Sequence, residues 1–275
     1  MYESLSDGDN ASLVDHVVDL LGSGRAGVIT DVDGTISPIV ALPEDARVEP
    51  AAHQALQTLM QHLTLVAVVS GRTATEARHM VGLDGLTYIG NHGFEVLRAG
   101  GPEVVPAALP WVRNLAAVLD SVQSEIQQPG VRIENKGATA SLHYRLAPDP
   151  ARTKHDLLEV LVQRAVPLGF QIEEGRMVIN VLPPLGISKG SAVSWLVAEH
   201  RLDRVVYLGD DETDTHAFRA LKVLRQSGEV RTLSIAVVDR ETPLSVRQLA
   251  DASLPSVHAV ADLLCRVAEL LEPEC

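Results

Sequence analysis

The 275-residue chain is predicted to fold as an α/β protein with a parallel sheet at its centre. Short, near-continuous apolar runs alternate with segments in which apolar residues recur at helical spacing. Several of these runs end in turns rich in Asp, Gly or Ser. Near-continuous apolar strands are typical of sheets that helices cover on both faces. We therefore expect a Rossmann-like core.

The first half of this core is expected before residue 107. Residues 50–63 open with Pro50, which suits the first turn of a helix. Residues 63–69 are rich in β-branched side chains, which favour strands. The expected elements are, in order, a helix over 11–22, a strand over 26–30, a helix over 50–63, a strand over 63–69, a helix over 73–81 and a strand over 86–89.

The pattern changes after Pro102 and predicts an inserted module over residues 107–182. Turns at Lys136-Gly137 and Glu174-Gly175 predict two hairpins. The order of elements, α-β-β-α-β-β, predicts an antiparallel sheet with two helices on one face. The expected helices cover 111–126 and 151–166, and the expected strands cover 131–135, 140–144, 170–173 and 177–181.

The parallel pattern resumes after the insert, so we expect a core made of residues 1–106 and 183–275. The elements expected in its second half are a helix over 188–200, a strand over 204–208, a helix over 214–225, a strand over 233–238 and a helix over 257–271.

Composition limits the class of function. The formal net charge of −13 argues against nucleic acid and anionic membrane as partners, because both need a basic face. Two cysteines and the absence of an apolar run long enough to cross a bilayer predict a soluble, cytoplasmic protein. We expect a monomer that acts on a small molecule.

Carboxylates gather at the expected strand ends. Asp31 and Asp33 follow the strand over 26–30, and two like charges so close are costly without a cation or a shared proton. Asp210, Asp211 and Asp214 follow a later strand. Oxygen ligands of this kind suit Mg²⁺, which shares its coordination sphere readily with a phosphate. Residue types suited to phosphate oxygens occur nearby at Ser70, Gly71 and Lys189.

These motifs, in this order, resemble the four signatures of the haloacid dehalogenase-like phosphatases. The signatures are Asp31-Val32-Asp33-Gly34-Thr35, Ser70, Lys189 and Gly209-Asp210-Asp211-Glu212-Thr213-Asp214. The insert resembles a C2-type cap. Further pieces of sequence resemble the trehalose-6-phosphate phosphatase family, namely Ser70-Gly71-Arg72, Gly90-Asn91-His92-Gly93, Glu134-Asn135-Lys136 and His143-Tyr144-Arg145.

The resemblance implies a Mg²⁺-dependent phosphatase that acts through an aspartyl-phosphate. It implies that Asp31 is the nucleophile and that Asp33 is the general acid and then the base. It further implies that Asp31, the backbone carbonyl of Asp33 and Asp210 bind the metal directly. Asp214 and Asp211 would complete the metal site by holding its waters or by orienting Lys189. The residues it implies for contact with the sugar are Arg72, Asn91, His92, Glu134, Lys136, His143 and Arg145.

Three positions depart from this family's pattern. Asn180 and Thr215 each stand where Glu is usual, and Leu182 stands where Arg is usual. The departures do not affect the residues expected for phosphoryl transfer, but they leave the identity of the substrate undecided. The alternatives are a phosphatase of a glucosyl- or mannosyl-phosphoglycerate, a phosphosugar mutase, and a sugar-phosphate binder without activity.

Overall fold

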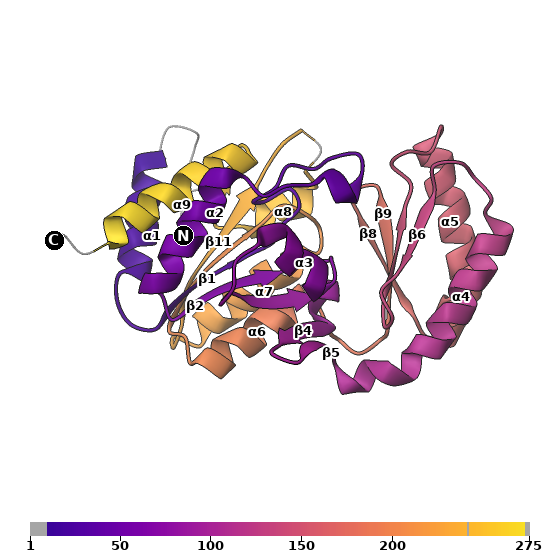
Figure 1. Cartoon of the computed structure of the whole chain (residues 1–275), viewed down its shortest axis with the longest axis horizontal. Helices are drawn as coiled ribbons and strands as arrows, with labels where there is room; N and C mark the ends of the chain where they lie inside the picture. Colours follow the sequence, from indigo (N-terminus) through magenta and orange to yellow (C-terminus); the bar gives the residue numbers. More distant parts are fainter. Residues whose placement is uncertain (1–9, 241, 273–275) are drawn as a thin grey trace.

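The described residues, 10–240 and 242–272 of a computed structural model, form two β-sheets (Figure 1). The larger sheet has the strand order β12-β11-β10-β1-β2-β3-β4-β5. The strands from β12 to β3 are parallel, and β4 and β5 extend the sheet as an antiparallel hairpin. Their bounds are β1 Ala26–Thr30, β2 Leu65–Val69, β3 Thr87–Gly90, β4 Glu95–Arg98, β5 Gly101–Val104, β10 Arg204–Gly209, β11 Arg231–Val237 and β12 Ala252–Leu254.

Helices cover both faces of this sheet. Successive strand residues point to opposite faces, so Val28 packs under one helical layer and Ile29 under the other. One layer holds α1 Asn10–Leu21, α2 Pro50–His62, α3 Ala74–Val81 and α9 Val257–Leu271. The other layer holds α6 Lys189–His200, α7 Asp214–Gln226 and α8 Leu244–Leu249. Short 3₁₀ turns occur at η1 Pro43–Asp45 and η2 Asn91–Gly93. We call this sheet with its helices the core.

The smaller sheet has the antiparallel order β6-β7-β9-β8, and its two helices lie on the side away from the core (Figure 1). Apolar side chains of α4 and α5, such as Leu115 and Leu157, pack against Leu142 and Ile179 of the sheet. We call this part the small unit. It comprises η3 Pro106–Trp111, α4 Val112–Glu125, β6 Arg132–Asn135, β7 Ala140–His143, α5 Pro150–Arg164, η4 Val166–Leu168, β8 Gln171–Gly175 and β9 Val178–Leu182.

A separate apolar cluster joins the two parts where the chain crosses between them. Phe94 from the core packs there with Ala108, Ala138 and Leu182, all of which are buried. The small unit therefore has its own hydrophobic centre and a narrow apolar junction with the core.

The predicted fold class is confirmed, and each predicted helix and strand has a counterpart. The sequence did not predict the β4–β5 hairpin, the short helix α8, the three-residue strand β12 or the 3₁₀ turns η1 to η4. Within the described ranges, none of the helices combines the length and the apolar character that a bilayer span requires.

Candidate active site

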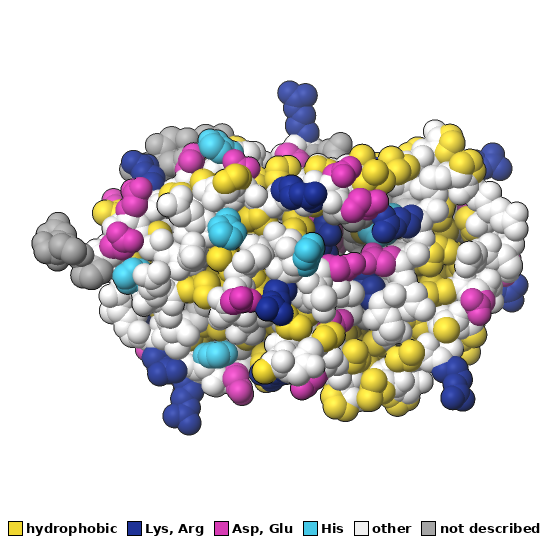
Figure 2. Space-filling model, viewed as in Figure 1, with side chains coloured by type: hydrophobic (Ala, Val, Ile, Leu, Met, Phe, Trp, Pro, Cys, Tyr) yellow, Lys and Arg dark blue, Asp and Glu magenta, His cyan; other side chains and the backbone are white. Residues whose placement is uncertain are grey.

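A cavity of about 820 Å³ lies between the small unit and the carboxyl ends of the core strands. Asp31 follows β1, Ser70 follows β2 and Asp210 follows β10, and these three strands are neighbours in the sheet. Ligands bind at this edge of open α/β sheets. Charged side chains of both signs gather at the middle of the face shown in Figure 2, between the core and the small unit.

Most of the predicted site residues line this cavity. They are Asp31, Asp33, Ser70, Gly71, Arg72, His92, Glu134, Lys136, His143, Arg145, Lys189 and Asp210. Two predicted residues lie behind the wall instead. Asn91 and Asp214 are both fully buried, and each contacts residues that line the cavity.

Three buried carboxylates meet at the floor of the cavity. Asp31, Asp210 and Asp214 each offer an oxygen within 4.8 Å of the others. The Lys189 ammonium lies 3.0 Å from Asp31 Oδ2 and 2.8 Å from Asp214 Oδ1. Within residues 10–240 and 242–272, the buried Oδ1 of Asp31 has no hydrogen-bond partner.

The electrostatics of this cluster favour a bound cation. Burial raises the pKa of Asp31 to about 7, against the opposing charge of Lys189 and with a further rise from Asp214. Burial and the neighbouring carboxylates Asp214 and Asp31 raise the pKa of Asp210 well above its ordinary value. Carboxylates that are this reluctant to ionise, with an oxygen left unpaired, fit a hard divalent cation with oxygen ligands.

Asp214 is saturated with hydrogen bonds. Its Oδ1 accepts from Lys189 and from the Tyr207 hydroxyl, and its Oδ2 accepts the backbone N–H groups of Asp210 and Asp211 at 3.0 Å each. This carboxylate therefore fixes the position of Lys189 and the shape of the loop after β10.

Gly34 permits the close approach of the two motif loops. Its φ of +81° lies in the left-handed region, and a Cβ built there would stand 2.1 Å from Asp210 Oδ2. The next residue, Thr35, donates its hydroxyl to Asp210 Oδ1 at 3.2 Å. The glycine is required both for its backbone conformation and for the space that the Asp210 carboxylate fills.

Asp33 is not one of the three clustered carboxylates and pairs with Arg72 instead. Arg72 Nε lies 2.6 Å from Asp33 Oδ2 and Arg72 Nη2 lies 2.7 Å from Asp33 Oδ1, so the contact is bidentate. The backbone N–H of Arg72 also donates to Ser70 Oγ at 3.2 Å. The loop after β2 thus positions both Ser70 and the partner of Asp33.

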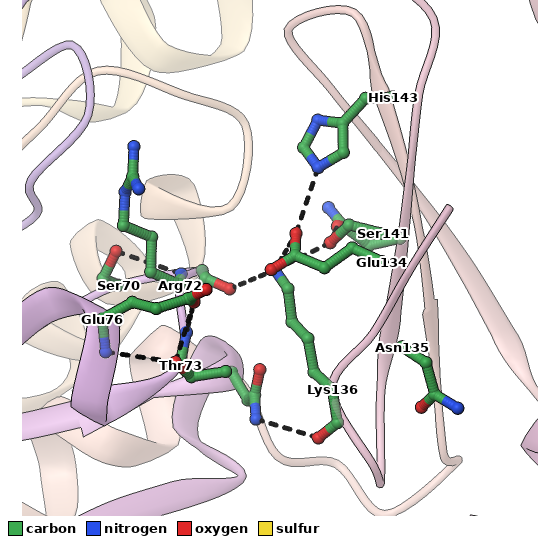
Figure 3. Close-up of polar contacts among 12 residues, drawn as sticks. Ser70, Arg72, Thr73, Glu76, Glu134, Asn135, Lys136, Ser141 and His143 are labelled. Atoms are coloured by element: carbon green, nitrogen blue, oxygen red, sulfur yellow. Dashed lines mark hydrogen bonds and ion pairs between the residues drawn. The ribbon is translucent and has the colours of Figure 1, made fainter. Parts of the chain in front are cut away.

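The small unit presents a second charged cluster from β6 and β7. Glu134 and Lys136 point into the site, while Asn135 between them points away, as alternation along a strand requires (Figure 3). His143 Nε2 lies 3.2 Å from Glu134 Oε2, and Lys136 Nζ lies 3.4 Å from the same oxygen. Burial alone would raise the pKa of Glu134, but the hydrogen bond from His143 and the charge of Lys136 lower it to about 2.

Lys136 also connects the small unit to the core. Its ammonium donates to the carbonyl of Gly71 at 2.7 Å and to Ser141 Oγ at 2.9 Å (Figure 3). Because an ammonium can only donate, the Ser141 hydroxyl accepts from it and donates its own hydrogen bond to Asn180 Oδ1 at 2.8 Å. This chain of donors fixes the orientation of the Asn180 amide.

The Gly90–Gly93 turn holds two predicted residues in the left-handed region, Asn91 at φ 51° and His92 at φ 59°. Asn91 Nδ2 donates to Glu95 Oε2 at 2.7 Å and approaches the carbonyl of Lys136 at 3.4 Å. The His92 ring is buried beside Gly71, where an added Cβ would stand 2.7 Å from His92 Cε1. Burial, with the charges of Lys136 and Lys189, lowers the pKa of His92 well below its ordinary value.

Several residues of the site were missed by the sequence reasoning, namely Glu95, Ser141, Arg176 and Tyr207. Tyr207 carried a signal, because a hydroxyl in the otherwise aliphatic strand β10 requires a buried partner. Arg176, at the tip of the β8–β9 hairpin, reaches Asp210 across the cavity. Arg145, predicted as a sugar contact, donates to the carbonyl of Arg176 at 3.1 Å.

Comparisons with known proteins show which family this chain resembles in sequence. The family model described as trehalose-phosphatase matches residues 29–249. A trehalose-phosphate phosphatase of Mycobacterium ulcerans is 36% identical over 208 residues, which cover 72% of this chain and 52% of that protein. An uncharacterized glycosyl hydrolase of Mycobacterium tuberculosis is 31% identical over 246 residues, which cover 83% of this chain and 18% of that protein. The chain thus spans about half the length of the first of these relatives and less of the second.

Solved structures share the fold. The C-terminal domain of a Candida albicans trehalose-6-phosphate phosphatase superposes with a TM-score of 0.81 at 23% identity, covering 98% of each chain. A trehalose-6-phosphate phosphatase related protein superposes with a TM-score of 0.72 at 24% identity, covering 89% of this chain and 97% of that one. Since the family model covers most of the sequence, including both Asp-containing motif loops, the chain belongs to the trehalose-phosphatase family.

Proposed function

We propose that this chain is a Mg²⁺-dependent phosphatase that hydrolyses trehalose 6-phosphate to trehalose and phosphate through an aspartyl-phosphate on Asp31. The observation that carries the proposal is the state of the Asp31 carboxylate. One of its oxygens is held by Lys189, and the other is buried and without a partner in the described part of the chain. It lies in the floor of a cavity large enough for a disaccharide phosphate.

In the first step, an oxygen of Asp31 attacks phosphorus and the bond from phosphorus to the sugar oxygen breaks. Lys189, with the Ser70 hydroxyl and the Gly71 backbone N–H, would hold the phosphoryl oxygens as charge redistributes. Asp31 and Asp210 would bind Mg²⁺, with the backbone carbonyl of Asp33 as a further ligand. The ion would neutralise the carboxylates and the phosphoryl group. Asp214 would take part through the position it gives Lys189.

Asp33 would carry the proton in both steps. Its carboxyl group donates a proton to the departing sugar oxygen, and its carboxylate then takes a proton from the water that hydrolyses the aspartyl-phosphate. In this structure both oxygens of Asp33 accept hydrogen bonds from Arg72, so the acid role requires this contact to open.

We propose residues 107–182 as a cap domain that selects the sugar. Glu134 is held ionised by His143 and Lys136 and can accept hydrogen bonds from sugar hydroxyls. His92 and Arg72 would contact the sugar from the core side, with Asn91 supporting the turn. Closure of the cap would keep bulk water from the aspartyl-phosphate until the sugar leaves.

A panel of sugar phosphates, assayed for phosphate release with Mg²⁺, tests the proposal. We expect trehalose 6-phosphate to give the highest kcat/KM, above glucose 6-phosphate and glucosyl- or mannosyl-phosphoglycerates. A phosphoglycerate as best substrate would correct the substrate and keep the chemistry. A rearranged sugar phosphate in place of free phosphate would indicate a mutase, and no product from any compound would indicate a binding protein.

A further inference from the structure

Arg176 is a side chain of the small unit that enters the carboxylate cluster of the core. It occupies the tip of the β8–β9 hairpin, between the paired residues Gly175 and Val178. The Arg176 side chain is 13% exposed. The turn is braced from its own side of the cavity, since Arg145 donates to the Arg176 carbonyl at 3.1 Å.

The guanidinium spans the ends of two neighbouring core strands. Its Nε lies 3.5 Å from Asp210 Oδ2, and its Nη2 lies 3.4 Å from the Asp210 carbonyl, just after β10. Its Nη1 lies 3.0 Å from Asp239 Oδ2, and its Nη2 donates to Thr242 Oγ1 at 2.7 Å, both beyond β11. Within the described ranges, the Nε of Arg176 is buried and has no hydrogen-bond partner, although it faces a carboxylate.

The buried negative charge of Asp210 makes its contact with the Arg176 guanidinium electrostatically important. Asp210 is 1% exposed and lies among other carboxylates. A guanidinium is always charged and is less strongly hydrated than an ammonium, so it can enter such a site from outside. In this arrangement, Arg176 supplies positive charge to the same carboxylate that the proposed function assigns to Mg²⁺.

We propose that Arg176 is a positioning residue through which closure of the cap and cation binding at Asp210 oppose each other. The inference rests on the proposed function, because it takes the carboxylate cluster as the cation site. Coupling between two binding events is reciprocal. If the docked guanidinium weakens cation binding, a bound cation weakens the docking of the hairpin tip to the same degree. In the substrate-free protein, the cap would then close most tightly on a core that holds no ion and would loosen as the ion binds.

A second ion pair between the two parts provides a matched control. Arg132 of β6 lies 2.8 Å from Glu44 of η1, and both side chains are more than half exposed. Neither residue belongs to the carboxylate cluster. Loss of Arg132 therefore removes a contact between the small unit and the core without changing the charge that faces Asp210.

The test is a calorimetric titration of substrate-free protein with Mg²⁺ alone. Removal of a positive charge a few ångströms from a cation site is expected to tighten cation binding about tenfold or more. Arg176→Met should therefore bind Mg²⁺ about tenfold more tightly than the unmodified protein. Arg176→Lys keeps the charge and should bind nearly as the unmodified protein does. Arg132→Met should change the affinity far less, because an exposed ion pair contributes little to closure of the cap. Arg176→Gln replaces Arg176→Met if the latter does not fold.

Unchanged or weaker Mg²⁺ binding by the neutral Arg176 variants would overturn the inference and leave the proposed function standing. Tightening by Arg132→Met that persists in the Arg176→Met background would also overturn it, because a loosened cap would then act without the guanidinium. If the unmodified protein binds no Mg²⁺, the proposed function fails first and this inference fails with it.

Discussion

At the scale of single residues, Asp31 controls the site because its carboxylate is buried among like charges. Burial raises its pKa from 3.8 to about 7. The folded state therefore holds this proton more tightly than the unfolded chain does. The stabilisation from the proton is complete below the unfolded value and is lost as the pH rises through about 7.

This shift predicts a pH dependence of metal binding. Below pH 7 a cation must displace the proton of Asp31, so Mg²⁺ affinity should fall by up to about tenfold per pH unit. The rise in melting temperature on addition of Mg²⁺ should be larger at pH 8 than at pH 6. Thermal unfolding with and without Mg²⁺ at both values measures it. An equal rise at both would contradict the raised pKa.

The roles of the two motif carboxylates can be separated by substitution. Asp31→Asn should abolish turnover, because the amide is nearly isosteric but is no nucleophile. Asp33→Asn should lose most activity on a sugar phosphate and much less on an aryl phosphate, whose leaving group needs little help from an acid. Steady-state kinetics on both substrates give the comparison. Equal losses for Asp33→Asn would argue against its role as general acid.

The sequence predicted those site residues that directly follow a strand of the parallel sheet. Asp31, Ser70 and Asp210 were predicted at one sheet edge because parallel strands end there together. Arg176 and Ser141 could not be found in this way. Their roles depend on how the small unit packs against the core, and local sequence periodicity does not predict that packing.

At the scale of elements, very short strands escaped prediction. β5 contains Pro102, which normally argues against a strand. The structure places β5 at the edge of the sheet. There, the missing N–H of a proline has no partner strand to lose. The strand β12 and the helix α8 span three and six residues, which is too short for a pattern to emerge.

Two glycines with nearly the same positive φ give a prediction about the motif loops. Gly34 has a φ of +81° and Gly137 has a φ of +82°. A Cβ at Gly34 would collide with the Asp210 carboxylate, whereas nothing lies within 4 Å of one at Gly137. Both Gly→Ala changes should cost about 1–2 kcal/mol of backbone strain, but only Gly34→Ala should also lose Mg²⁺ binding.

Calorimetry with Mg²⁺ and urea unfolding of both variants measure these effects. Normal Mg²⁺ affinity in Gly34→Ala would show that the loop can move away from Asp210 at no cost to the site.

At the scale of the whole molecule, two parts with separate hydrophobic centres enclose one cavity. The order of helices and strands in the insert was predicted from the sequence, because each half of the insert consists of a helix followed by a hairpin. The contacts that hold the parts together, such as Lys136 to the Gly71 carbonyl and Arg132 to Glu44, were not readable. They join residues of two parts that have separate hydrophobic centres.

If the proposed cap selects the sugar, substitutions in it should affect a disaccharide phosphate more than a small aryl phosphate. Glu134→Ala should damage kcat/KM for a disaccharide phosphate by about 10- to 100-fold, since a hydrogen bond to a charged group contributes about 1.5–3 kcal/mol. A small aryl phosphate makes no such bond and should lose little. Lys136→Ala should have the same selectivity with an added loss of cap closure. Asn135→Ala, whose side chain points away from the site (Figure 3), is the control.

Kinetic constants for the three variants on both substrates make the comparison. Equal losses on the disaccharide phosphate and the aryl phosphate would remove the cap from substrate selection.

The most direct test of the account is the release of phosphate from trehalose 6-phosphate by the unmodified protein and by Asp31→Asn. The account predicts saturable release with Mg²⁺, loss of turnover when EDTA removes the ion, and recovery when Mg²⁺ is added back. Asp31→Asn should remain folded by circular dichroism and release no phosphate under any of these conditions. Full turnover in metal-free protein, or in the folded Asp31→Asn variant, would contradict the account.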